Sequence, residues 1–205
     1  MILRMPPPLE PGARVALVAP ARFASPALIE STSELLASWG YEAAVLEETR
    51  SRDRQFGGTD AERAAAFNAA LRDPEVGAVW ALRGGYGCTR ILPLLDGDSL
   101  QAQPTWITGF SDITALHGWA SGLGVASLHA PVASTVPATE AQDVAALREV
   151  WPAEICAQKP FKKGAVLVHY TVCFSRGPYS LPVHPSELTS VCRNGTVCQY
   201  GLHKN

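Results

Sequence analysis

The chain has 205 residues, of which 47% are hydrophobic, which is enough for one well-packed domain with or without a smaller second unit. The formal net charge of −2 and the lack of a basic stripe argue against a nucleic-acid-binding protein. No apolar run approaches the length of a membrane-spanning helix, and the first residues lack the apolar core of a signal peptide. We therefore expect a soluble, cytoplasmic protein that binds neither nucleic acid nor membrane.

Short apolar runs alternate with helical patterns over the first 150 residues. In chain order, strands are predicted at 14–20, 42–47, 76–82, 104–110 and 125–131. Helices are predicted between and after them, at 25–40, 59–74, 88–96, 112–124 and 139–151. Ser25 is a suitable N-cap for the first helix and Gly40 a suitable end. Thr59 and Glu62 have the spacing of a capping box at the start of the second helix.

This alternation predicts an α/β fold, in which a parallel sheet has helices on both faces. Ligands of such sheets bind at the carboxyl ends of the strands. Two glycine-containing sequences follow predicted strands directly, at 82–87 (LRGGYG) and 109–112 (GFSD). Both are therefore candidates for a functional site.

The first of these sequences, 82–87, contains three glycines before a helical pattern. One interpretation is a phosphate-binding turn, but the spacing differs from G-x-G-x-x-G, no P-loop lysine follows, and no acid stands where a dinucleotide site needs one. A second interpretation is a plain tight turn. A third is that Gly84 and Gly85 let the backbone approach a ligand closely and supply an oxyanion donor facing Ser111. The spacing leaves all three open.

Ser111 lies at the corner between the fourth predicted strand and the next helix. One interpretation is a nucleophile on a tight strand-to-helix turn, with the Asp112 N–H as an oxyanion donor and Gly109 giving the backbone room to turn. The other is a helix N-cap. The second glycine of G-x-S-x-G is missing, so the motif alone favours the N-cap.

The composition changes sharply near residue 158. Eleven arginines and no lysine precede it, whereas four lysines and two arginines follow, and 18 of the 19 acidic residues precede it. We predict a division into an α/β domain at 1–155 and an atypical tail at 156–205. We interpret the tail as irregular or β-rich and as frameshifted, foreign or truncated, with an ordinary domain boundary as the milder alternative.

Within the tail, Gly164–Phe174 can form a strand or a hairpin, and the proline-containing sequence 176–190 is predicted to be a loop. The odd number of cysteines and the absence of a secretion signal argue against a disulfide framework. The tail cysteines and histidines include no closely spaced ligand pair, so we expect no metal site. The cysteines are Cys88, Cys156, Cys173, Cys192 and Cys198.

Four sequences together resemble the LD-carboxypeptidase family, the serine peptidases that trim muropeptides. They are LEPGARVALVAP (9–20), GGTDAERAAAFNAALRDPEVGAVWALRGGYGCTRILPLLD (57–96), ITGFSDITALH (107–117) and LHAP (128–131). Their order and spacing also resemble that family, and the resemblance covers roughly residues 9 to 150. It changes the preferred interpretation of Ser111 from an N-cap to a nucleophile.

The resemblance implies a parallel α/β domain followed by a smaller β-rich domain. It implies that Ser111 is the nucleophile and that the backbone N–H groups of Gly85 and Asp112 hold the oxyanion. The implied reaction is hydrolysis of the amide between an L-centre and a terminal D-alanine in a muropeptide, without a metal or cofactor. The family also implies a cytoplasmic homodimer that acts in peptidoglycan recycling, and a related branch cleaves microcin-type peptidyl nucleotides.

The sequence departs from the family pattern in three places. Ala130 replaces a usual glycine, and 19–25 (APARFAS) replaces a usual small turn that contains serine. The larger departure is that the Glu and His of the family's triad are not identifiable after Val150. The later acids and histidines lack a family-like context; they are Glu154, Glu187, His169, His184 and His203. His117 lies nearly two helical turns after Ser111, so we expect it to be a packed or surface residue rather than a replacement base.

Three function classes follow. The first is an LD-carboxypeptidase-type serine hydrolase with an incomplete triad, or its microcin-immunity-type relative acting on peptidyl nucleotides. The second is a non-catalytic remnant that binds a peptide or nucleotide in the same cleft. The third is a nucleotide-binding Rossmann-like domain, which the missing fingerprint disfavours. The first class requires Ser111 to lie beside the 82–87 loop.

Overall fold

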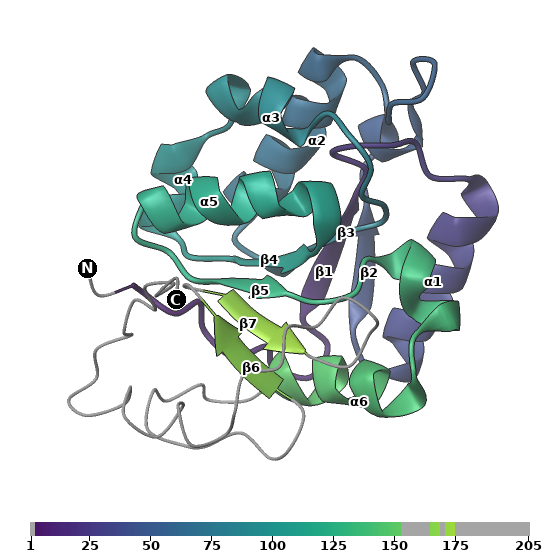
Figure 1. The fold of residues 1–205 in the computed structure, drawn as a ribbon, viewed down its shortest axis with the longest axis vertical. Helices are drawn as coiled ribbons and strands as arrows, with labels where there is room; N and C mark the ends of the chain where they lie inside the picture. Colours follow the sequence, from purple (N-terminus) through teal and green to yellow (C-terminus); the bar gives the residue numbers. More distant parts are fainter. Residues whose placement is uncertain (1–2, 153–164, 169–170, 175–205) are drawn as a thin grey trace, which may run out of the picture.

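A computed structural model describes residues 3–152, 165–168 and 171–174, and within them one sheet forms the centre of the molecule (Figure 1). Its order is β2-β1-β3-β4-β5-β7-β6, and the pairs from β2 to β5 are all parallel. The strands are β1 (Arg14–Val18), β2 (Glu42–Val45), β3 (Val76–Ala81), β4 (Trp106–Gly109), β5 (Ser127–His129), β6 (Ala165–Val168) and β7 (Thr171–Phe174). The predicted parallel α/β fold is confirmed.

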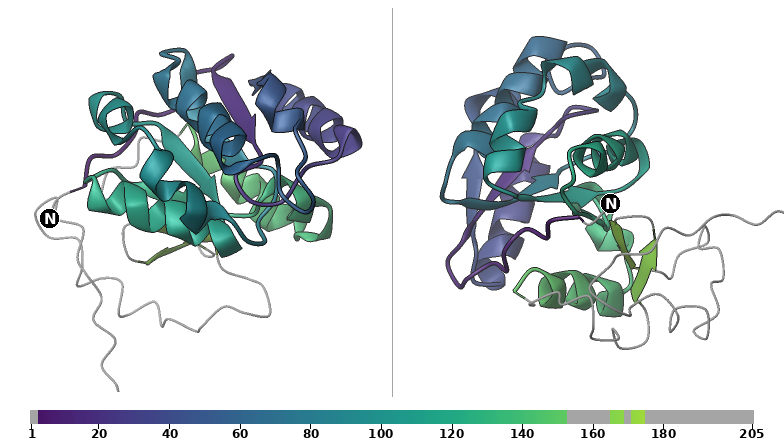
Figure 2. Two further views of the ribbon diagram at one scale, coloured as in Figure 1. Left: turned by 90° about the horizontal axis from the view of Figure 1, so that it is seen from above. Right: turned by 90° about the vertical axis from the view of Figure 1, so that its left-hand side faces the viewer.

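Helices cover both faces of this sheet, as Figures 1 and 2 show. Helices α2 to α5 lie on one face, and α1 and α6 on the other. The α-helices are α1 (Pro26–Ser38), α2 (Asp60–Arg72), α3 (Cys88–Ile91), α4 (Gly97–Ala102), α5 (Thr114–Gly122) and α6 (Ala141–Val150). The short 3₁₀ turns are η1 (Glu47–Arg50), η2 (Leu92–Leu94), η3 (Ser111–Ile113) and η4 (Ala133–Ala138).

The predicted helix caps are present. The Ser25 hydroxyl accepts a hydrogen bond from the Leu28 N–H, and Thr59 and Glu62 form a reciprocal capping box at the start of α2. Gly40 takes a positive φ of 86° just after α1, where other residues are strained. Helix α4 was not predicted, because it is short and polar and lacks an apolar period; the Asp96 carboxylate caps it.

Alternate residues of the inner strands supply the two cores. In β1, Val15 and Leu17 belong to the cluster under α1 and α6, whereas Ala16 and Val18 belong to the cluster under α2 to α5. This follows from the period of two in a strand, which sends successive side chains to opposite faces. Near-continuous apolar strands are therefore typical of a sheet that is buried on both faces.

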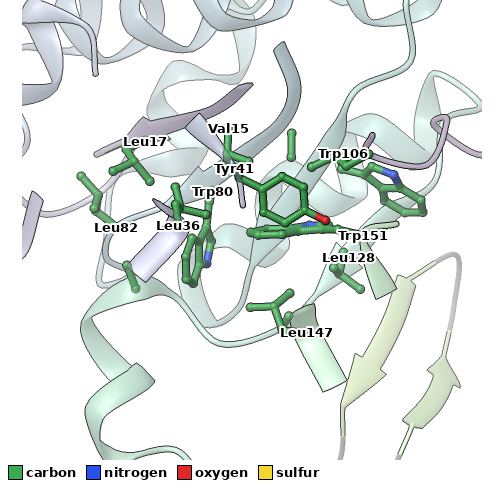
Figure 3. Packing of buried hydrophobic residues seen from close by; sticks show 14 of the residues in the cluster. Val15, Leu17, Leu36, Tyr41, Trp80, Leu82, Trp106, Leu128, Leu147 and Trp151 are labelled. Carbon is green, nitrogen blue, oxygen red and sulfur yellow. The ribbon is translucent and has the colours of Figure 1, made fainter. Parts of the chain in front are cut away.

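Four aromatic rings join α1, β3 and the end of α6 on one face of the sheet, and Figure 3 labels three of them, Tyr41, Trp80 and Trp151. The ring centroid of Trp151 lies 5.4 Å from that of Trp80, 5.8 Å from that of Tyr41 and 5.9 Å from that of Trp39, each in an edge-to-face arrangement. The Trp151 indole also donates a hydrogen bond to the Thr108 hydroxyl. The end of α6 is thereby fixed to the strand that leads to Ser111.

The Gly164–Phe174 sequence contributes a hairpin, one of the two structures expected for it. Strands β6 and β7 pair antiparallel, and β7 pairs parallel with β5, so the hairpin extends the sheet at that edge. The predicted loop at 176–190 lies outside the described residues, as does most of the tail. The boundary at 155/156 stays a prediction.

None of the helices in the described part of the chain is long and apolar enough to cross a membrane.

Replacing Trp151 by Ala should lower the free energy of unfolding by about 3–5 kcal/mol, because it removes a fully buried indole and leaves a cavity beneath α6. Leu94→Ala is the matched control, since that side chain is 48% exposed and its loss should change stability by less than about 0.5 kcal/mol. Urea denaturation of the two variants measures the difference. Equal effects would contradict the role assigned to the aromatic cluster.

Candidate active site

The 82–87 loop and the Ser111 corner meet at the carboxyl edge of the sheet. Strands β3 and β4 are parallel neighbours, so the segments that follow them emerge side by side. A Cβ atom placed on Gly84 would lie 3.1 Å from Ser111 Cβ and 3.4 Å from Ser111 Oγ. The glycine therefore allows the loop to pass directly against the serine, which any side chain would push away.

Ser111 has a strained backbone at the end of β4. Its φ is 63°, in the left-handed region that non-glycine residues rarely adopt. Gly109, two residues earlier, has a φ of 158°, and a Cβ there would lie 2.9 Å from the Ile113 side chain. The chain thus turns sharply enough to leave Ser111 exposed above the sheet. This matches the turn expected for a nucleophile on a strand-to-helix corner.

The motif alone favoured a helix N-cap at Ser111, but Ser111 does not cap a helix. The 3₁₀ turn η3 begins at Ser111 itself, α5 begins at Thr114 rather than Asp112, and neither has a side-chain cap. The Ser111 hydroxyl has no hydrogen-bond partner among the described residues. A capping serine sits one position before its helix with an extended backbone, and the positive φ removes that option.

The side chain of Asp112 fixes the glycine loop to this corner. Its carboxylate accepts a hydrogen bond of 2.9 Å from the Cys88 N–H, at the start of α3. Burial and the nearby Asp112 carboxylate both raise the pKa of the Cys88 thiol, so Cys88 stays protonated and is not a candidate nucleophile. The sequence did not predict this contact, because nothing in it shows where the Asp112 side chain points.

Arg63 is a second anchor of the loop that the sequence did not reveal. Its guanidinium is completely buried and donates hydrogen bonds to the carbonyls of Pro20 and Gly87, and it pairs with the Asp60 carboxylate. It therefore links the carboxyl end of β1 to the end of the glycine loop. Arginines on helices usually lie in solvent, so only the tertiary contacts distinguish this one.

Two backbone N–H groups of the glycine loop and the serine corner have no hydrogen-bond acceptor among the described residues. No residue in the described ranges accepts a hydrogen bond from the N–H of Gly85 or from that of Asp112. Gly85 is exposed with a φ of 124°, and Asp112 lies in the first turn of η3, where N–H groups have no intrahelical acceptor. Both groups are therefore free to bind an anion or a polarised oxygen.

His117 is a packed residue, as expected, and holds the corner from below. Its Nε2 lies 2.9 Å from the Gly109 carbonyl oxygen and its Nδ1 lies 2.9 Å from Ser127 Oγ. The carbonyl can only accept, so Nε2 carries the proton and Nδ1 accepts from the Ser127 hydroxyl. Both ring nitrogens are thus occupied, and His117 is not available as a base for Ser111.

Burial lowers the pKa of His117 to about 4, so the ring is neutral at pH 7. His129, at the end of β5, has its ring centroid 5.7 Å from that of His117, and burial lowers its pKa as well. A second histidine at this distance further disfavours the charged form of His117. The two imidazoles form a neutral pair beneath the site.

The described residues contain no group of three or more histidine, cysteine or acidic side chains able to hold a metal ion.

The parallel sheet and the exposed, strained serine at its carboxyl edge define an α/β protein with a hydrolase-like strand-to-helix corner. The model of the LD-carboxypeptidase N-terminal domain matches residues 15–130, more than half of the chain, and the chain belongs to that family. The matched region contains β1 apart from its first residue, β2 to β5, the glycine loop and the Ser111 corner. It ends before α6 and before the β6–β7 hairpin.

Individual relatives agree with this assignment. The murein tetrapeptide carboxypeptidase of Pseudomonas aeruginosa is 38% identical over 122 residues, which cover 59% of this chain and 40% of that protein. The structure of a muramoyltetrapeptide carboxypeptidase from Oxalobacter formigenes aligns with a TM-score of 0.62 and 27% identity, over 68% of this chain and 48% of the other. The structure of the microcin C7 self-immunity protein MccF in complex with glutamyl sulfamoyl guanosine aligns with a TM-score of 0.68, over 76% of this chain and 48% of the other. The two sequences are 22% identical over the alignment, so the similarity shows a shared fold. The chain spans less than half the length of the curated relatives it matches.

Replacing Ser111 by Gly should stabilise the protein by about 1 kcal/mol relative to Ser111→Ala. Glycine relieves a left-handed backbone that costs other residues about 1–3 kcal/mol, and part of that gain is lost to the greater entropy of glycine in the unfolded chain. Ser33→Gly, within α1, is the control and should lower stability by about 0.5 kcal/mol. Thermal or urea unfolding of these variants tests this. A Ser111→Gly variant that is less stable than Ser111→Ala would contradict the strained turn.

Stability should fall as the pH is lowered from 6.5 to 5. His117 in the unfolded chain takes up a proton near pH 6.5, whereas the folded protein resists protonation down to about pH 4, so the unfolded state binds more protons in this window. The loss attributable to His117 is roughly 1.5 kcal/mol over these 1.5 pH units, and His129 acts in the same direction. Urea titrations of wild type and His117→Gln at several pH values should show a flatter dependence for the variant; identical slopes would refute the assignment.

Proposed function

We propose that this domain supplies the nucleophile and the oxyanion site of an LD-carboxypeptidase-type serine hydrolase. The observation that carries the proposal is the exposed Ser111 hydroxyl on a left-handed corner, packed against the glycine loop. Such strain persists only where the surrounding structure enforces it, and here Gly109, His117 and the Asp112–Cys88 hydrogen bond do so. A serine without this role gains nothing from the conformation.

In the proposed reaction Ser111 Oγ attacks the carbonyl carbon of an amide. The carbonyl oxygen gains negative charge as the tetrahedral intermediate forms, and the free N–H groups of Gly85 and Asp112 are proposed to stabilise it. A general base takes the proton that Ser111 Oγ loses and passes it to the amine, which leaves, and water then hydrolyses the acyl-serine. Besides the general base, the proposed chemistry uses a hydroxyl, backbone amides and water, and it needs neither a metal nor another cofactor.

The proposed substrate is a muropeptide whose last amide joins an L-centre to a terminal D-alanine. The murein tetrapeptide carboxypeptidase among the relatives supports this substrate class. A peptidyl nucleotide is the alternative substrate, supported by the similarity to the microcin C7 self-immunity protein of Escherichia coli, 35% identical over 83 residues that cover 40% of this chain and 24% of that protein. We further propose a cytoplasmic role in peptidoglycan recycling, and a homodimer.

The general base is the part of the triad that the described residues do not supply. His117 is committed on both ring nitrogens, and no described histidine or acid is hydrogen-bonded to Ser111. The family's Glu and His motifs are not identifiable after Val150. A serine hydroxyl reacts slowly at neutral pH without a base within hydrogen-bond reach, so we propose that residues 1–205 alone hydrolyse the substrate very weakly.

A non-catalytic binding domain is the second candidate. The observation that favours it is the same missing base, because the free N–H groups of Gly85 and Asp112 would bind a peptide carbonyl whether or not Ser111 reacts. The two candidates differ in whether Ser111 becomes acylated.

Purified protein incubated with a muropeptide tetrapeptide should release D-alanine slowly, and added imidazole should accelerate the release by acting as the missing base. Ser111→Ala should lower the rate sharply with and without imidazole, because no acyl-serine can form and the oxyanion donors alone leave only residual catalysis. Ser121→Ala, a half-buried serine within α5, is the control and should retain the wild-type rate. Chromatographic detection of D-alanine gives the rates.

Release that does not depend on Ser111 would refute the proposed nucleophile. Release that imidazole does not accelerate, but that depends on both Ser111 and one of the three tail histidines, would show that the tail supplies the base. Binding of the tetrapeptide without any release would favour the non-catalytic domain.

A further inference from the structure

Arg22 is an exposed cation beside the candidate active site with no assigned role. It follows β1 by four residues, and its backbone forms an isolated antiparallel bridge with Phe56. A Cβ placed on Gly85 would lie 2.8 Å from both Cγ and Cδ of Arg22. The Arg22 stem therefore crosses directly over the backbone whose N–H is proposed to bind the oxyanion.

The other arginines around the loop are already engaged. Arg63 is buried in its contacts with Asp60 and two carbonyls, and Arg90 pairs with Asp60. Arg83 donates to the Phe23 carbonyl, and Arg52 lies over the Phe23 ring with 3.9 Å between its guanidinium carbon and the ring centroid. Within the described residues, Arg22 makes no hydrogen bond or ion pair, so its guanidinium is available to a ligand.

The glycine loop lies between Arg22 and Ser111. Arg22 contacts the loop at Gly85 and Ser111 contacts it at Gly84, and consecutive Cα atoms are about 3.8 Å apart, so Arg22 Cδ and Ser111 Cβ are at most roughly 13 Å from each other. A serine in position to attack lies about 3 Å from the carbonyl carbon, one extended residue spans about 3.5 Å, and a guanidinium–carboxylate hydrogen bond adds about 2.8 Å. One residue beyond the scissile bond, at about 9 Å in all, is accommodated within this limit.

We propose that Arg22 binds the terminal carboxylate of the substrate and thereby selects peptides with a single residue after the scissile amide. This rests on the proposed function and makes Arg22 a specificity-determining residue. The planar guanidinium forms two parallel hydrogen bonds with a carboxylate, which a lysine at the same position would not reproduce. A longer peptide would place an uncharged amide opposite Arg22 and leave its carboxylate beyond reach.

Binding of two matched peptides to the full chain tests the proposal. The probes are N-acetyl-L-lysyl-D-alanine and its C-terminal carboxamide, titrated by NMR with Ser111→Ala present in every protein to prevent turnover. The parent should bind the acid about 10-fold more tightly than the carboxamide. Adding Arg22→Ala should remove this preference by weakening the acid alone, and Arg22→Lys should restore part of it.

Arg4→Ala is the charge-matched control, because Arg4 pairs with the segment before β5 at the opposite, amino end of the sheet. It should leave both affinities unchanged, and the NMR spectra report whether each variant is folded. A preference for the acid that survives Arg22→Ala would overturn the proposal for Arg22 and leave the proposed function intact. Failure of the parent to bind either peptide, or to distinguish them, would count against the proposed function as well.

Discussion

The hydrogen bond from the Cys88 N–H to the Asp112 carboxylate joins the two segments on which the candidate site depends. The glycine loop follows β3 and the serine corner follows β4, and parallel pairing brings the two strand ends together without fixing the segments beyond them. The carboxylate closes that gap, and the buried Arg63 fixes the far end of the loop to β1. The site is therefore held by charged groups with buried partners, which are costly to break.

The strained backbone of Ser111 is held in place by contacts at the end of β4. The His117–His129 pair and the aromatic cluster around Trp151 provide them. His117 fixes the Gly109 carbonyl and Ser127 together, so β4, α5 and β5 meet at one imidazole. On the other face of the sheet the Trp151 indole donates to Thr108, one residue before Gly109. The end of β4 is thus held from both faces of the sheet, and a left-handed residue at its tip is kept in place by packing rather than by local preference.

In the proposed scheme, the described residues supply some parts of a serine hydrolase and leave one part to other residues. The proposed nucleophile and oxyanion donors lie at strand ends and tight turns, which one sheet edge positions together. A general base must approach the serine from the solvent side, and the described residues place no free imidazole there. In the proposed scheme the domain binds and orients the substrate, and the base determines the rate.

The apolar runs and helix caps determined the sheet, the order of its first five strands along the chain and the ends of α1 and α2, because these depend on local periodicity and on hydrogen bonds within a few residues. The motif around Ser111 indicated a special corner, but local rules alone favoured an N-cap there. Only the tertiary structure decided that Ser111 has a left-handed backbone beside Gly84, that Asp112 points to Cys88, that Arg63 is buried and that Arg22 crosses Gly85. Each of these is a contact between residues at least 20 positions apart or a backbone conformation imposed by such contacts, and a side chain's partner across that distance is set by how the strands pack, which no local pattern encodes.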